Sequence, residues 1–97
     1  MIVRMIYVQV PEGELEQART VWKEHCAPLM IGVGGCLSEQ LLACNEAPGE
    51  MISMSTWDSA EAVKAYRDSE AHHEIQRHTR ELLKGARASV KTYEIVP

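Results

Sequence analysis

The sequence has no phenylalanine and few aromatic residues of any kind. Its 97 residues include two tryptophans and three tyrosines, although 45% of all residues are hydrophobic. Aliphatic side chains and methionines must therefore fill most of the core, and each aromatic residue stands out as a candidate for a special role. Because a single domain of this size buries a modest share of its surface, association with a second copy would add stability.

The chain has three cysteines, and their spacing fits neither a disulfide framework nor a zinc site. Cys26, Cys36 and Cys44 are an odd number, form no CxxC pair and have no histidine cluster at metal-site spacing. Disulfide-rich domains and structural zinc sites depend on such patterns. We therefore expect reduced thiols, no metal site and a cytoplasmic protein.

Long apolar runs, basic runs and cofactor fingerprints are absent as well. No stretch approaches the ~18 apolar residues of a membrane span, and the first residues lack the pattern of a signal peptide. Ten basic and fourteen acidic residues give a formal charge of −4, with no basic stripe that could neutralise a row of phosphates. No dinucleotide fingerprint, P-loop or HExxH motif occurs. We expect no membrane, no nucleic acid and no cofactor.

The hydrophobic pattern predicts a single domain, 1–97, with the element order β-α-β-β-α-β. Alternation and β-branched residues predict strands, and apolar residues three and four apart predict helices. Pro28 should end or bend the first helix near Ala27, and Asp58 or Ser59 should cap the second helical region, which Ser69 restarts. The predicted strands span 1–10, 36–44, 51–57 and 88–96, and the predicted helical regions span 14–27 and 59–85.

This order is that of the split βαβ arrangement, so the predicted fold class is α+β, ferredoxin-like, with a four-stranded antiparallel sheet. Both helical regions then lie on one face of the sheet. The first strand is apolar on both faces, and an uncovered apolar face favours a second subunit. We therefore expect a homodimer that associates through its sheet faces.

The junction from Ser53 to Trp57 is the first candidate site. Ser53, Ser55 and Trp57 share one strand face because side chains alternate along a strand. A large ring beside small hydroxyls suggests a pocket, although Trp57 could equally be a core aromatic.

A polar cluster on the last helical run is the second candidate site. His73 and Arg77 are four residues apart and share a helix face, and neighbouring His72 and His73 cannot both point inward. The alternative interpretation is a solvated surface. The other candidate pocket residues are Tyr7, Trp22, His25, Gln40, Tyr66 and His72.

The run WDSAEA that begins at Trp57, followed by Tyr66 and by SEAH at Ser69, resembles the signature of the antibiotic biosynthesis monooxygenase family. Gly35 and the last strand also resemble that family, so the likeness covers nearly the whole chain. The resemblance implies a dimeric α/β barrel of ferredoxin-like topology. Members include cofactor-free oxygenases that convert phenols or quinols to quinones, heme-degrading oxygenases and proteins of undefined role.

The resemblance also implies residue roles. In the polyketide-oxidising branch an Asn, a Trp and an Arg are implicated, and this chain has Trp57 and Arg77 with Ser53 at the Asn position. In the heme-degrading branch, ungapped matching places Ile6 at a strand-one Asn and Gln76 at the iron-ligating His, with His73 one turn away.

On this resemblance we expect a cofactor-independent monooxygenase that acts on a small phenolic, aromatic or quinol-like molecule. Trp57 would contact the substrate, His73 would be the base or anion partner, Arg77 would stabilise charge and Ser53 would donate a hydrogen bond. The alternatives are a non-catalytic dimer that binds a small molecule and a heme-degrading oxygenase.

Overall fold

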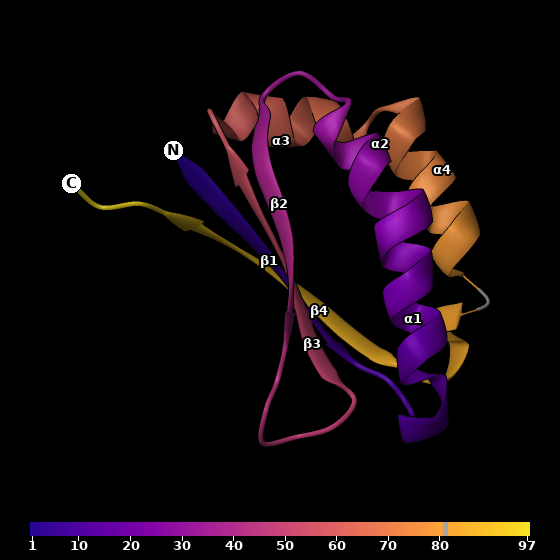
Figure 1. Ribbon diagram of the computed structural model, residues 1–97. Coiled ribbons are helices and arrows are strands. Elements are labelled where there is room, and N and C mark those ends of the chain that lie inside the picture. The colour runs from indigo at the N-terminus through magenta and orange to yellow at the C-terminus, as the bar shows by residue number, and fades with distance from the viewer. Residues whose placement is uncertain (81) are drawn as a thin grey trace.

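Four antiparallel strands form one sheet, and the helices cover one of its faces (Figure 1). The computed structural model describes residues 1–80 and 82–97. The sheet order is β2-β3-β1-β4, which confirms the predicted ferredoxin-like α+β fold. The strands are β1 (Ile2–Gln9), β2 (Cys36–Ala43), β3 (Glu50–Trp57) and β4 (Arg87–Glu94).

The first helical region is longer than the sequence predicts, because Pro28 does not end it. A short 3₁₀ turn, η1 (Glu12–Glu14), leads into α1 (Leu15–Val21), a wide π turn, η2 (Trp22–Cys26), and α2 (Ala27–Ile31). In the π turn the N–H of Ala27 bonds the carbonyl of Trp22, five residues back. Pro28 then lies in the first turn of α2, where its missing N–H costs nothing.

The second helical region consists of α3 (Ala60–Arg67) and α4 (Glu70–Thr79), each capped by a serine. Ser59 Oγ accepts a hydrogen bond from the N–H of Ala62 at 3.1 Å, and Ser69 Oγ accepts one from the N–H of His72 at 3.2 Å. Both caps satisfy N–H groups that a helix start leaves unpaired. The predicted run to residue 85 continues in η3 (Leu82–Gly85), while residue 81 lies outside the described residues.

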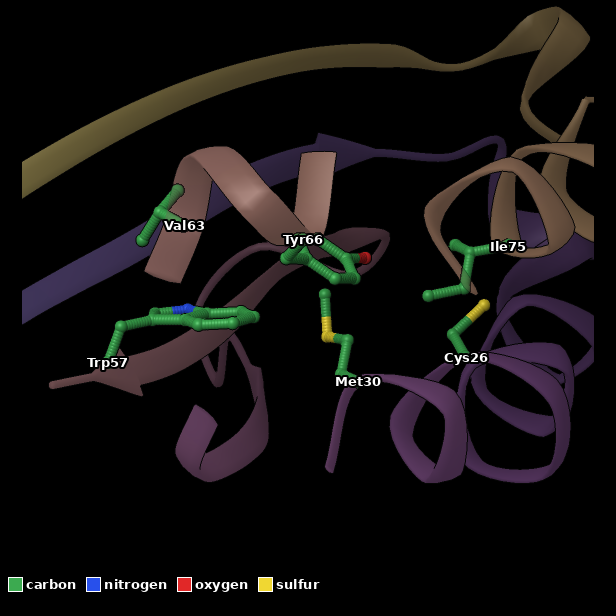
Figure 2. Packing of buried hydrophobic residues seen from close by; sticks show 6 residues of the cluster. All are labelled: Cys26, Met30, Trp57, Val63, Tyr66 and Ile75. Carbon is green, nitrogen blue, oxygen red and sulfur yellow. The ribbon is translucent and has the colours of Figure 1, made fainter. Parts of the chain in front are cut away.

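The core lies between the sheet and the helices, and its largest side chains are aromatic. Trp57 and Tyr66 are 0% exposed. They pack in one cluster, which Figure 2 shows: Cys26, Met30, Trp57, Val63, Tyr66 and Ile75. A smaller cluster joins Val10, Ala18 and Met51. Members of both clusters border the cavity described below.

The other face of the sheet has no helix over it in the described part of the chain (Figure 1). Burial alternates along β3, so that Met51, Ser53, Ser55 and Trp57 are buried beneath the helices while Ile52 and Met54 are half-buried on the opposite face. The β1 register places Val3, Met5 and Tyr7 beside these two residues. We call this group, Val3, Met5, Tyr7, Ile52 and Met54, the outer apolar face.

Candidate active site

A largely apolar cavity of about 300 Å³ lies between the sheet and the helices. Both helical regions and all four strands contribute to its wall, because the helix layer meets the sheet layer there. Figure 2 shows Tyr66, Met30, Cys26 and Ile75 converging from separate elements, with the Tyr66 hydroxyl directed toward Ile75 and Cys26. The polar lining residues are Arg4, Ser53, Tyr66, His72, Gln76 and Thr79, together with the indole of Trp22.

Trp57 lies behind this wall and is not among the described lining residues. Its Nε1 donates a hydrogen bond to Ser55 Oγ at 2.8 Å, and its ring packs against Tyr66 with centroids 5.0 Å apart. Tyr66 in turn borders the cavity, and burial raises the pKa of its hydroxyl to about 12. Trp57 therefore fixes the position of a cavity residue, and its contact with a substrate stays a prediction.

Trp22, Ser53 and Glu39 form a hydrogen-bonded chain at the cavity wall. Trp22 Nε1 donates to Ser53 Oγ at 3.2 Å, and Ser53 Oγ donates to Glu39 Oε1 at 2.7 Å. The second oxygen, Glu39 Oε2, is buried without a partner. Burial raises the pKa of Glu39 to about 7, although the hydrogen bond from Ser53 opposes the shift. This carboxyl group can therefore exchange a proton near neutral pH.

A β-bulge in β2 turns the Glu39 side chain toward Ser53. The sequence prediction assumed strict alternation along this strand and therefore missed Glu39. The register slips between Cys36 and Ser38, so that Cys36 and Glu39 both lie on the helix side, opposite Trp57 and Ser55. Strict alternation from Cys36 would have turned Glu39 away and Gln40 inward. Instead Gln40 pairs with Met54 on the opposite face.

Arg4 and His72 bring unpaired polar atoms to the cavity. Arg4 is 5% exposed, and its Nε and Nη1 are buried without hydrogen-bond partners. His72 Nδ1 is also buried without a partner, and the ring meets Tyr66 edge-on at 5.1 Å. Burial lowers the pKa of His72, and the positive charge of Arg4 adds to that shift. Both effects favour the neutral imidazole, whose buried Nδ1 can form a hydrogen bond with a ligand at the cavity.

Four other predicted residues lie away from the cavity. Tyr7 is on the outer apolar face, where its hydroxyl meets that of Tyr93 at 3.1 Å. His25 is exposed and stacks on His78 with centroids 4.4 Å apart. His73 and Arg77 are exposed on α4, where Arg77 pairs with Glu70 and Glu74. A catalytic role for His73 and Arg77 stays a prediction.

Among residues 1–80 and 82–97, no three His, Cys, Asp or Glu side chains are grouped so that they could hold a metal ion. The described helices include none that is long and apolar enough to cross a bilayer.

Solved structures of similar shape cover almost the whole chain. A putative antibiotic biosynthesis monooxygenase from Deinococcus radiodurans has a TM-score of 0.85 at 15% identity, covering 100% of this chain and 94% of that chain. A variant of SnoaB, a cofactor-independent oxygenase from Streptomyces nogalater, has a TM-score of 0.75 at 11% identity, covering 97% and 91%. A variant of MhuD with two manganese protoporphyrin IX groups per active site has a TM-score of 0.81 at 22% identity, covering 100% and 96%. At these identities the likeness shows the fold.

Sequence comparison identifies the family directly. A search of curated proteins finds no match. The model of the antibiotic biosynthesis monooxygenase family, however, matches residues 1–78, a span that runs from β1 to α4 and includes the Trp22–Ser53–Glu39 chain. This chain therefore belongs to the antibiotic biosynthesis monooxygenase family.

Proposed function

We propose that this chain is a cofactor-independent monooxygenase that oxidises a phenolic or quinol-type small molecule. The observation that carries the proposal is the apolar cavity whose wall includes Trp22 and Ser53, with Glu39 hydrogen-bonded to Ser53 behind that wall. Its volume of about 300 Å³ is at the small end of the range for ligand sites, which suits a small aromatic molecule.

The proposed reaction converts a phenol and O₂ to a quinone and water. One oxygen atom of O₂ enters the ring, and the other leaves as water. The two hydrogen atoms of that water come from the phenolic O–H group and from the ring carbon that is oxygenated. The phenol thereby gives up four electrons and O₂ accepts four, so that no further reductant is needed.

The residues at the wall supply a route for the phenolic proton. A phenolate releases an electron to O₂ more readily than the phenol does, so the reaction begins with deprotonation. Ser53 can receive the proton while passing its own to Glu39, which its hydroxyl contacts at 2.7 Å. Burial raises the pKa of Glu39 to about 7, and a base is most effective when its pKa lies near the working pH.

Oxygen consumption tests this proposal directly. A panel of hydroquinones and polycyclic phenols is supplied to the protein in the presence of a chelator, with no added flavin. We expect oxygen uptake with at least one compound and a loss of about 10²-fold or more in kcat for Glu39→Gln and Ser53→Ala. Glu50→Gln, which makes the same change at an exposed carboxylate of β3, should leave kcat unchanged. Equal rates for Glu39→Gln and the wild type would refute the proton route.

The structure supports the residue roles predicted from the resemblance to different degrees. Trp57 packs on Tyr66, so Trp57→Phe should lower turnover by loosening the cavity wall. Of the two adjacent histidines, His72 borders the cavity while the His73 side chain is 54% exposed. We therefore propose that His72→Ala raises KM and that His73→Ala and Arg77→Ala do so to a smaller extent.

A non-catalytic binding protein is the second candidate. The placement of Trp57 in the core rather than at the cavity favours it, because the residue would then serve packing alone. Saturable quenching of tryptophan fluorescence by hydroquinones, without oxygen uptake from any of them, would establish this alternative.

The residues at the cavity do not fit a heme. Gln76 borders the cavity at the position that the resemblance assigns to an iron ligand, and an amide is not among the usual axial ligands of heme. His73, the other candidate ligand, is exposed on α4. We expect no Soret band that depends on His72 or His73 when hemin is added.

We also propose a homodimer formed through the outer apolar face. Val3, Met5, Tyr7, Ile52 and Met54 remain partly accessible in one copy, and a contiguous apolar face favours association. A second copy of the same sheet face is self-complementary under a twofold axis.

A further inference from the structure

The cavity contains a buried positive charge that the chain itself does not neutralise. Arg4 extends from β1 beneath the helices and is 5% exposed, and its Nε and Nη1 have no hydrogen-bond partner. None of the ion pairs among the described residues includes Arg4. A guanidinium stays protonated in proteins, and an unpaired buried charge is costly. An anionic ligand in the cavity would supply the missing counter-charge.

The neighbours of Arg4 hold the cation in place without cancelling its charge. Its Cζ lies 5.7 Å from the centroid of the Tyr66 ring, which gives a cation–π contact. The backbone carbonyl of Arg4 accepts a hydrogen bond from Ser55 Oγ at 3.5 Å. Tyr66 and Ser55 are both almost fully buried, so Ser55 holds the backbone at Arg4 while the Tyr66 ring flanks the guanidinium.

The rest of the cavity adds no negative charge. No aspartate or glutamate is among the described residues of its lining. Glu39 lies one hydrogen bond further out, beyond Ser53. His72 contributes an imidazole whose Nδ1 is buried without a partner, so it can donate or accept one hydrogen bond beside the cation. The cavity therefore offers one buried cation and one neutral hydrogen-bonding ring among apolar side chains.

We propose that the cavity selects apolar ring compounds that carry one anionic oxygen group, either a carboxylate or an ionised enol or phenol, and that Arg4 binds this group. The inference rests on the proposed function in one respect, since it takes the same cavity as the binding site. It adds that charge on the ligand, and not only aromatic shape, determines affinity. Hydrogen bonds to a charged partner are stronger than neutral ones and are strengthened further in a poorly solvated site.

A matched pair of ligands tests the carboxylate arm. 2-Naphthoate and 2-naphthamide have the same ring and nearly the same shape, and they differ in charge. Binding is measured by isothermal titration calorimetry at pH 7. We expect 2-naphthoate to bind at least about tenfold more tightly than the amide, and this ratio to fall to about one in Arg4→Met.

The phenolate arm uses 4-nitrophenol, whose absorbance reports its ionisation. Bound to the wild-type protein, it should titrate at lower pH than in buffer, and Arg4→Met should abolish the shift. A naphthoate preference without this shift identifies a carboxylate ligand, whereas the shift without the preference identifies an ionised enol or phenol. Absence of both, in protein that binds the neutral ring compounds, would overturn the proposal.

Matched variants separate charge recognition from structural damage. Arg4→Lys keeps the charge and should retain part of the preference for 2-naphthoate. Arg19→Met removes an arginine from an exposed pair with Glu16 on α1 and should leave the ligand ratio unchanged. Because binding is measured without turnover, a protein that prefers the anion and consumes no oxygen would support this inference and contradict the proposed oxygenase activity.

Discussion

Glu39 is half-buried beside Ser53, and its protonation is linked to folding. Its pKa is about 7 in the folded chain, because burial disfavours the carboxylate, against 4.5 for the ordinary group. A raised pKa means that the proton stabilises the folded chain fully below pH 4.5, and that this stabilisation is lost as the pH rises through 7.

We therefore predict that Glu39→Gln, which cannot ionise, changes the pH dependence of stability. The variant should melt close to the wild type at pH 5 and a few degrees above it at pH 8, since about 1 kcal/mol corresponds to roughly 4–8 °C for a domain of this size. Thermal unfolding followed by circular dichroism measures the difference. Glu50→Gln is the control, and a difference in Tm that is the same at both pH values would contradict the shifted pKa.

We expect Arg4 to lower the stability of the ligand-free protein while it strengthens ligand binding. Without a ligand its guanidinium is a buried charge with two unpaired nitrogen atoms. We predict that Arg4→Met raises the Tm of the free protein by several degrees, because an apolar side chain of similar length fills the space without the cost of desolvating a charge. The control Arg19→Met alters an exposed ion pair and should change the free energy of unfolding by less than about 1 kcal/mol.

The same comparison in the presence of 2-naphthoate gives the complementary result. The ligand should raise the Tm of the wild type and have a much smaller effect on Arg4→Met, because stabilisation by a ligand grows with its affinity for the folded chain. A fall in the Tm of ligand-free Arg4→Met would show that the guanidinium stabilises the empty cavity.

At the scale of elements, a serine cap holds the backbone of His72 at the start of α4. Ser69 Oγ accepts a hydrogen bond from the N–H of His72 and donates one to the carbonyl of Tyr66. One serine thus ties the helix that carries His72 to the end of α3. The Ser69 cap is therefore hydrogen-bonded to the backbone of two residues of the cavity wall, Tyr66 and His72.

We predict that Ser69→Ala destabilises the fold by about 1 kcal/mol and also weakens ligand binding at the cavity. Ser69→Asp keeps an acceptor at the cap and should retain most of the stability. Urea denaturation measures the first effect, and titration with 2-naphthoate measures the second. Ser89→Ala, at an exposed position of β4, is the control, and a loss of stability without any change in affinity would separate the cap from the site.

The whole molecule has one face protected by helices and one face that is not (Figure 1). We predict that the wild type sediments as a dimer at micromolar concentration and that Met54→Glu, in the middle of the outer apolar face, converts it to a monomer of 10.9 kDa. A buried pair of like charges across the twofold axis opposes association. Sedimentation equilibrium measures the mass.

The control for this experiment is Lys64→Glu, which changes charge at an exposed position on α3 without touching the outer apolar face. It should sediment as the wild type does. A wild-type mass of one chain at micromolar concentration would refute the proposed dimer.

The sequence by itself determined the arrangement of elements, because each depends on local chemistry. Alternation and β-branched residues predicted the strands, Asp58 or Ser59 and then Ser69 indicated the two helix starts, and the shared face of Ser53, Ser55 and Trp57 followed from the period of two. The first helical region was shorter in the prediction, since the π turn that lets the chain pass Pro28 has no signal in residue spacing.

Only the tertiary structure decided which side chains meet at the cavity. Glu39 faces the helices because a bulge at Cys36 and Ser38 shifts the alternation by one residue, and such a bulge changes no hydrophobic pattern that a sequence displays. Arg4 lies beneath the helices because it pairs with Ser55 across the β1–β3 ladder and shares the buried face of β3. Burial, which raises the pKa of Glu39 and leaves Arg4 unpaired, is a property of packing between distant segments and cannot be read from neighbours along the chain.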